Sequence, residues 1–197
     1  MIVAIDGLGV NGKSTLAKRI ADELGFKYMN TGAIYRCIAL EIISKNLNIE
    51  NIDEIIQKLK NIKVNFKCNK TYLDGKDVTK EIKTELISIK STEWATKLKI
   101  KELVRKIQRN ILETGNTVIE GRDICTRIAP NADLKFYLYS DFEIRVKRLW
   151  NTEKNVPIED VRKNLLKRDD LDINCGNFIK PIGAKEIDTT NLNLDWW

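Results

Sequence analysis

The sequence of 197 residues contains no histidine, and its four cysteines form no C-x-x-C pair. Histidine is the most frequent general base in enzymes, and closely spaced cysteine and histidine residues are typical zinc ligands. We therefore expect neither a histidine base nor a structural zinc site. No apolar run approaches the roughly 18 residues of a membrane-spanning segment, and the N-terminus leads directly into a charged strand and loop instead of a secretory leader. These absences predict a cytoplasmic protein without a membrane partner.

Positive charge is what the composition supplies in excess. Apolar residues make up 43% of the chain, which is enough for a core, and the net charge is +6. Such a balance suits either nucleic acid or a site for several phosphate groups. Many basic residues gather between positions 145 and 168, where Trp150 is the one aromatic side chain available for stacking on bases. We therefore favour the phosphate site and expect no nucleic-acid partner.

The stretch GLGVNGKST, residues 7–15, is the most informative motif. It follows the apolar run IVAI and precedes TLAKRIADEL, in which apolar residues recur at helical spacing. The pattern G-x-x-x-x-G-K-[ST] runs from Gly7 to Ser14, and its backbone N–H groups surround a phosphate at the start of a helix. We predict that Lys13 contacts the β- and γ-phosphates and that Ser14 binds Mg²⁺. The predicted ATP-binding residues are Gly7, Leu8, Gly9, Val10, Asn11, Gly12, Lys13, Ser14 and Thr15.

Apolar periodicity predicts an alternation of strands and helices. Strands are expected at 2–5, 27–30, 117–121, 133–139 and 185–188, and a hairpin at 63–79 around Asp74-Gly75. Helices are expected at 15–24, 33–45, 51–60, 92–113 and, after the capping box SDFE at 140–143, as far as Trp150. Such alternation is typical of a parallel sheet with helices on both faces. The predicted fold class is therefore α/β.

Polar residues follow four of these strands where each one ends. The phosphate loop follows the first strand, Asn30-Thr31-Gly32 follows the second, EGRD at 120–123 closes the third, and a helix bearing Arg145 follows the fourth. Ligands of open parallel sheets bind beyond the carboxyl ends of the strands. We therefore expect these residues to surround bound phosphates.

Several stretches together resemble the bacterial-type cytidylate kinases of the nucleoside monophosphate kinase group. They are AIDG, GKST, LGFKYMNTGAIYR, YLDGKDVTKEI, QRN, EGRDICT, PNADLKFYL, KRDDLD and EIDTTNL, which extend over nearly the whole chain. The resemblance implies a P-loop NTPase-type sheet in a single kinase unit over residues 1–197, with a core at about 1–58 and 91–197, a small inserted substrate-binding domain at about 59–90 and a lid at about 150–175. It also implies Mg²⁺- and ATP-dependent phosphorylation of CMP, and of dCMP, by a monomer.

The same resemblance implies roles for individual residues. Thr31 and Arg36 are assigned to the acceptor phosphate, and Arg122 to the cytosine base together with a hydroxyl group from the start of the helix at 92–113. Arginines and an aspartate of the lid side meet the phosphates and the acceptor sugar. The implied catalytic residues are Lys13, Arg145 and Arg168, and the implied CMP-binding residues are Thr31, Arg36, Ser91, Thr92, Arg122, Asp123, Arg168 and Asp172.

Four positions depart from the pattern of this family. Val10 replaces a third loop glycine, Asn30 an aspartate, Cys125 a glycine, and Cys175 the last arginine of the lid pattern R-D-x-x-D-x-x-R. We expect these departures to affect catalytic strength more than the type of reaction. The alternatives are a kinase for UMP or another phosphorylated acceptor on the same scaffold and, in a different class, a non-enzymatic nucleic-acid-binding protein.

Overall fold

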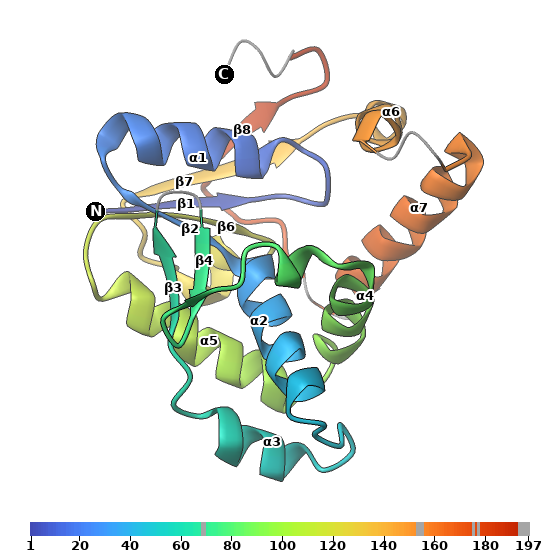
Figure 1. The fold of residues 1–197 in the computed structure, drawn as a ribbon. Helices are drawn as coiled ribbons and strands as arrows, with labels where there is room; N and C mark the ends of the chain where they lie inside the picture. Colours follow the sequence, from blue (N-terminus) through green and yellow to red (C-terminus); the bar gives the residue numbers. More distant parts are fainter. Residues whose placement is uncertain (68–69, 153–155, 175, 177, 193–197) are drawn as a thin grey trace. The chain divides into compact units, whose positions relative to one another are not determined.

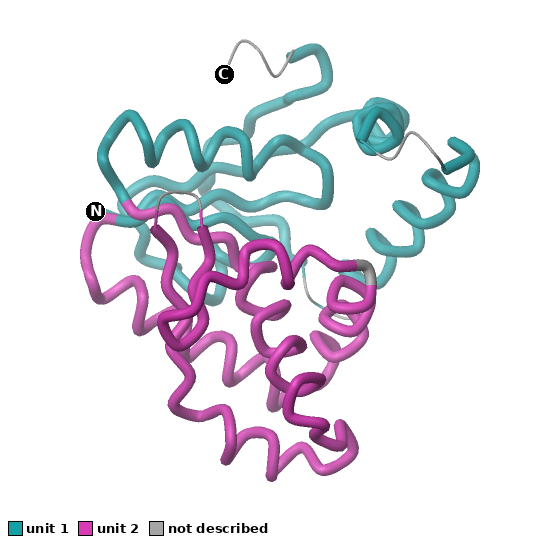
Figure 2. Tube along the Cα trace, viewed as in Figure 1, with its two compact units in different colours: residues 1–26, 117–197 teal, residues 27–116 magenta. Residues whose placement is uncertain are grey.

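The computed structural model describes residues 1–67, 70–152, 156–174, 176 and 178–192 (Figure 1). Two compact units make up the chain: unit 1 contains residues 1–26 and 117–197, and unit 2 contains residues 27–116 (Figure 2). The boundaries expected for the substrate-binding insertion and the lid remain predictions. None of the helices found among the described residues is long and apolar enough to cross a membrane.

Four strands of unit 1 form a parallel sheet in the order β6-β1-β7-β8. Their bounds are Ile2–Asp6 for β1, Thr117–Gly121 for β6, Leu134–Tyr139 for β7 and Lys185–Asp188 for β8. All five residues of β6 are buried, and so are the last four of β1, because apolar side chains of a central parallel strand point into both layers. The expected strands of this unit are confirmed, and their carboxyl ends lie at one edge of the sheet.

Among its described residues, unit 1 also contains three α-helices and one π-helical turn. They are α1 at Lys13–Leu24, η2 at Ile124–Ile128, α6 at Phe142–Thr152 and α7 at Ile158–Asn174. Glycines with positive φ flank α1, with Gly12 at 82° and Gly25 at 63°, conformations that glycine adopts without a steric penalty. Helix α7 was expected only as part of a lid. It packs on α6 through Val161 and Leu165, which bury themselves against Val146.

The capping residue of α6 differs from the expectation. The SDFE box predicted Ser140 as the N-cap, but the Oδ1 atom of Asp141 accepts the amide protons of Glu143 and Ile144 at 2.8 and 3.3 Å. Ser140 instead donates its hydroxyl proton to Oδ1 of Asn11, 2.7 Å away. Serine and aspartate are both good N-cap residues. Because the hydroxyl of Ser140 is bonded to Asn11, Asp141 serves as the cap.

Unit 2 consists of helices, a small antiparallel sheet and the separate strand β2. Its elements are β2 at Lys27–Asn30, α2 at Thr31–Ser44, α3 at Ile52–Leu59, β3 at Val64–Lys67, β4 at Lys70–Leu73, β5 at Lys76–Asp77, η1 at Glu81–Lys83, α4 at Glu85–Trp94 and α5 at Leu98–Leu112. The predicted hairpin has three strands, in the order β3-β4-β5, and its turn is formed at Asp74 and Gly75, both with positive φ. Ile34, Ile38 and Ile42 of α2 lie in the core.

The single helix expected at 92–113 is wrong, because the chain forms α4 and α5 with a break at residues 95–97. Lys97 is extended, with φ −75° and ψ 122°, and its amide donates to the carbonyl of Trp94. Trp94 and Leu98 are four residues apart and suggested one apolar face. Trp94 is buried, whereas Leu98 is 64% exposed. The apolar periodicity therefore continued across two separate helices that bury different faces.

Candidate active site

The glycine-rich loop runs from the end of β1 to the start of α1, as its sequence predicts. Gly7 has φ 154°, and a Cβ atom built on it would lie 2.2 Å from the carbonyl oxygen of Leu138 in β7. Only glycine fits such a close approach of two backbones. The loop is also bonded at Asn11, whose side chain is held by Ser140 and whose carbonyl accepts from the Thr189 hydroxyl at 3.3 Å. Contacts at the ends of β7 and β8 therefore fix the course of the loop.

Lys13 is buried beneath this loop. The residue is 7% exposed, and its Nζ atom donates to the carbonyl oxygen of Leu8 at 2.7 Å. Burial lowers the pKa of Lys13 to about 8; the carboxylate of Glu120 opposes this shift, and the charges of Arg122 and Arg168 add to it. A buried ammonium group with two guanidinium groups near it is stabilised by a polyanionic partner.

Ser14 and Thr15 lie in the first turn of α1 and are exposed. The hydroxyl of Ser14 donates to Oε1 of Glu120 at 2.9 Å, and Glu120, at the carboxyl end of β6, is 5% exposed. Glu120 belongs to the EGRD motif, but it was not predicted as a site residue. Its position could have indicated one, because an acidic residue at the end of a buried parallel strand faces the ligand edge of the sheet.

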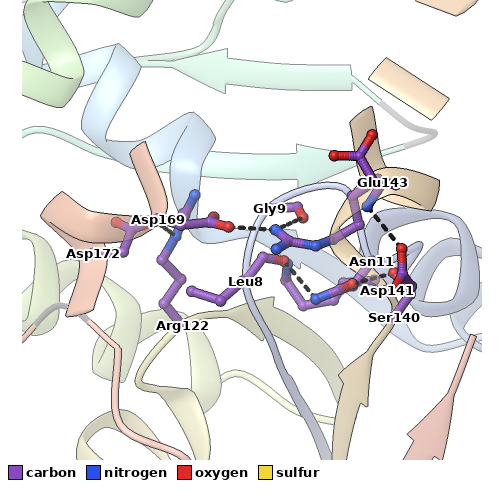
Figure 3. A network of polar contacts seen from close by, with 11 residues as sticks. Leu8, Gly9, Asn11, Arg122, Ser140, Asp141, Glu143, Asp169 and Asp172 are labelled. Carbon is purple, nitrogen blue, oxygen red and sulfur yellow. Dashed lines mark hydrogen bonds and ion pairs between the residues drawn. The ribbon is translucent and has the colours of Figure 1, made fainter. Parts of the chain in front are cut away.

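Three predicted arginines lie near Gly9 of the loop, and Figure 3 labels Gly9 and Arg122. Arg145 of α6 is 6% exposed, and its Nη1 atom donates to the Gly9 carbonyl at 3.2 Å. An ideal Cβ at Gly9 would lie 3.9 Å from Nη2 of Arg122 and 4.0 Å from Nε of Arg168. The structure thus brings three arginines to one point of the phosphate loop. Arg122 comes from the turn between β6 and η2, Arg145 from α6 and Arg168 from α7.

Two carboxylates of α7 hold two of these arginines. Asp169 accepts from Nη1 of Arg145 at 2.6 Å, with both side chains 7% exposed, and Asp172 forms an ion pair with Nε of Arg122. Asp169 was not predicted as a site residue, although it is three positions before Asp172 and shares its helix face. Oδ1 of Asp169 and Nε of Arg145 are both buried without a hydrogen-bond partner, so this pair is held through one nitrogen and one oxygen only.

Asp6 ties the end of β1 to the turn after β6. It is fully buried, and its two carboxylate oxygens accept the amide protons of Ile124 at 2.9 Å and Cys125 at 2.8 Å. Burial raises the pKa of Asp6 to about 6, against the lowering effect of these two bonds. Burial also raises the pKa of the Cys125 thiol, which makes this thiol a poor nucleophile.

Asp123, a predicted CMP-binding residue, forms an ion pair with Arg127. The distance between its Oδ2 atom and Nη1 of Arg127 is 3.7 Å.

The remaining predicted residues belong to unit 2. Asn30 caps α2 by accepting the amide proton of Ala33 at 2.9 Å, a function that asparagine and aspartate perform equally well. Thr31 is buried in the first turn of this helix, and Nε of Arg36 donates to the Gly32 carbonyl at 3.2 Å.

Ser91 and Thr92 were expected at the start of a long helix, but they lie near the end of α4. Both hydroxyls donate to the carbonyl oxygen of Ser88, at 2.9 and 3.0 Å. Cys175, where the lid pattern lacks its arginine, lies outside the described residues. Lys180, a cation close to it in sequence, pairs with Glu186 at 2.7 Å.

Comparisons with known proteins agree on a family. The model of the family described as cytidylate kinase matches residues 3–195. A cytidylate kinase of Caldanaerobacter subterraneus subsp. tengcongensis is 38% identical over 198 residues, covering 96% of this chain and 88% of the relative. A cytidylate kinase of Clostridioides difficile is 33% identical over 201 residues, covering 99% and 93%.

Solved structures show the same fold at much lower identity. Shikimate kinase from Bacteroides thetaiotaomicron matches with a TM-score of 0.50 and 11% identity over 100% of this chain and 90% of that one. TT1252 from Thermus thermophilus matches with a TM-score of 0.51 and 14% identity over 99% and 91%. The predicted P-loop NTPase-type α/β fold is therefore confirmed, and the profile match and the close relatives show that this chain belongs to the cytidylate kinase family.

Proposed function

We propose that this protein transfers the γ-phosphoryl group of ATP to CMP, and also to dCMP. The observation that supports this most directly is the likeness, over nearly the full length of both chains, to proteins named cytidylate kinase. The loop with its buried lysine and three neighbouring guanidinium groups is the kind of site that a phosphoryl transfer requires. We further propose that the protein acts as a monomer in the cytoplasm, on small molecules and without nucleic acid.

In this proposal, the loop of residues 7–15 holds the donor phosphates. Its backbone N–H groups and the start of α1 bind phosphate oxygens, and Nζ of Lys13 exchanges the Leu8 carbonyl for an oxygen of the β- or γ-phosphate. The transition state of phosphoryl transfer is loose and spreads negative charge over the peripheral oxygens. Arg145 and Arg168 stabilise that charge from the α6 and α7 side. No general base is needed, because the acceptor phosphate is already ionised, which fits a sequence without histidine.

The resemblance assigns Arg122 to the cytosine base, and this role remains a proposal. Its Nη2 atom lies 3.9 Å from an ideal Cβ position at Gly9 of the donor loop, and a guanidinium fork can bind two phosphate oxygens in fixed geometry. We therefore propose a phosphate contact for Arg122 as a second possible role beside cytosine reading. The roles of Thr31, Arg36, Ser91, Thr92, Asp123 and Asp172 in binding CMP remain proposals taken from the family resemblance.

The oxygen atoms of Ser14 and Glu120 fit a magnesium ion. A hydroxyl and a carboxylate are ligands that Mg²⁺ accepts, and this ion usually completes its shell with water and phosphate oxygens. The described residues contain no cluster of three or more acidic or cysteine side chains that could hold a metal alone. When bound with ATP, Mg²⁺ neutralises charge on the phosphates. Ser14 would supply a direct contact and Glu120 would orient its hydroxyl.

The affinity for ATP is expected to fall as the pH rises above about 8. Lys13 must carry a proton to pair with a phosphate, and burial lowers its pKa to about 8 in the ligand-free protein. Above that pH the charged fraction, and with it the association constant, drops roughly tenfold per pH unit. Titration with a nonhydrolysable ATP analogue measures the effect. Lys13→Arg is the control, because arginine stays charged, so its affinity for the analogue should not fall in this pH range. If the affinity of the wild-type protein were equally independent of pH, the prediction would be wrong.

The acceptor is tested by measuring ADP release with CMP, dCMP, UMP, AMP and GMP. We expect CMP and dCMP to give the highest kcat/KM. Each lost polar contact to a base costs about 1–3 kcal/mol, so discrimination against the other bases should be tenfold or more, 1.4 kcal/mol being a factor of about ten. A preference for UMP would favour the alternative kinase, and ATP turnover with none of the five would refute the proposal.

A further inference from the structure

Val10, in the middle of the phosphate loop, has an unusual backbone conformation. Its φ is 64°, in the left-handed region. The other described non-glycine residues with positive φ are Asn46 and Asp74, whose short polar side chains tolerate this region. A β-branched side chain does not, and valine at such a φ marks a strained position. Strain of this kind persists only where the surroundings hold the residue in place.

The side chain of Val10 is held by the helices α6 and α7. It packs against a buried cluster of three residues, Val146, Val161 and Leu165. The same cluster also receives Phe142, Leu149, Val156 and Ile158. All of these residues come from the two helices or from the segment that joins them. Val10 is therefore the point where the phosphate loop enters the apolar contact between α6 and α7.

Gly9, the preceding residue, is held by a hydrogen bond to α6 and lies close to α7. Its carbonyl accepts from Arg145 of α6, which Asp169 of α7 holds in turn (Figure 3). Leu165 of α7 comes within 3.8 Å of the position a Cβ would take at Gly9. Two consecutive loop residues are thus attached to α6 and α7, the first by a hydrogen bond and the second by its side chain.

We propose that Val10 is a positioning residue, whose side chain anchors the donor loop to α6 and α7 and keeps the loop in its phosphate-binding conformation before ATP arrives. The inference rests on the proposed donor site. Ordering a mobile loop on binding costs affinity, and a loop ordered in advance avoids that cost. A glycine at position 10 would remove the strain, but it would also remove the anchor and add backbone freedom.

This predicts that stability and donor binding respond differently to Val10→Gly. Relief of strain and loss of packing oppose each other in the folded protein, so Tm should change by no more than a few degrees. The dissociation constant for a nonhydrolysable ATP analogue and the KM for ATP should rise roughly tenfold, equivalent to about 1.4 kcal/mol. The KM for CMP should stay within about twofold. A residue with a merely structural role would not separate the two substrates.

Val161→Ala shortens one member of the cluster on which Val10 packs, without changing the loop. It should also weaken binding of the ATP analogue, and the double variant should be less affected than the product of the two single effects, because both changes weaken the same apolar cluster. Asn46→Gly is the matched control. It relaxes a positive φ at an exposed helix end of unit 2, and it should leave the affinity for the analogue unchanged.

Each outcome decides a different question. If the wild-type protein fails to bind the ATP analogue, the proposed donor site is wrong, whatever Val10 does. If wild type binds and Val10→Gly binds equally well or more tightly, the anchoring role is overturned. It is also overturned if the effects of Val10→Gly and Val161→Ala multiply independently, because the loop would then depend on residue 10 without depending on the helices.

Discussion

Replacing Lys13 with alanine should reduce kcat by about 10²–10³-fold or more, which is typical for the loss of one group that stabilises transition-state charge. The fold should survive the change. The folded protein lowers the pKa of Lys13 because burial disfavours its charged form, so removing this side chain takes away an unfavourable charge. The rate of ADP formation with CMP and a thermal melt followed by circular dichroism measure the two effects.

The informative result for Lys13→Ala is inactivity with an unchanged or higher Tm. Transfer at close to the wild-type rate would mean that the donor phosphates bind elsewhere. Inactivity together with a large drop in Tm would instead show that Lys13 serves the fold, through its bond to the Leu8 carbonyl. Lys13→Met, which keeps the length of the side chain, separates the loss of charge from the loss of packing.

Asp169→Ala should destabilise the protein by about 3–5 kcal/mol, because it leaves a buried guanidinium without its carboxylate. The residue is 5% exposed and Arg145 is 6% exposed, so water cannot replace the lost partner. In a chain of this size, such a loss lowers Tm by roughly 10 °C. Chemical denaturation and a thermal melt measure it, and addition of an ATP analogue should restore part of the loss by placing phosphates beside Arg145.

The chain offers a matched control for this prediction. Arg162 and Glu143 also join α7 to α6, at 2.8 Å, but their side chains are 33% and 51% exposed. Exposed ion pairs contribute little, so Glu143→Ala should hardly change Tm. The exposed pair has two hydrogen bonds and the buried pair has one, so a larger loss for Asp169→Ala can be attributed to burial and not to the number of bonds. Similar losses for Asp169→Ala and Glu143→Ala would contradict the prediction.

The phosphate loop could be predicted because everything that defines it is contiguous. Glycine at position 7, glycine at 12 and a lysine beside it specify a turn, an approach of backbone to ligand and a cation within one short stretch. The buried strands of unit 1 could also be predicted, since short apolar runs such as IVAI and TVIEG are typical of buried strands.

Other features depend on partners distant in sequence. Asp169 and Arg145 are 24 positions apart in a stretch full of charged residues, and no spacing rule selects this pair from the others. Whether Ser140 or Asp141 caps α6 was decided by Asn11, which is 129 positions from Ser140. The break between α4 and α5 depends on which face each helix buries, a property of the folded unit. Local patterns carry no information about these choices.

The arrangement of the two units along the chain has a consequence for the order of folding. Strand β1 pairs with β6 and β7, and the first residues in register, Ile2 of β1 and Thr117 of β6, are separated in sequence by the whole of unit 2. The ribosome therefore releases residues 27–116, a continuous stretch that forms a compact unit of its own, before β1 has any neighbour in its sheet. Closing so long a loop is slow. During synthesis, the apolar strand β1 must stay unpaired until β6 emerges, and unpaired apolar strands are prone to aggregation.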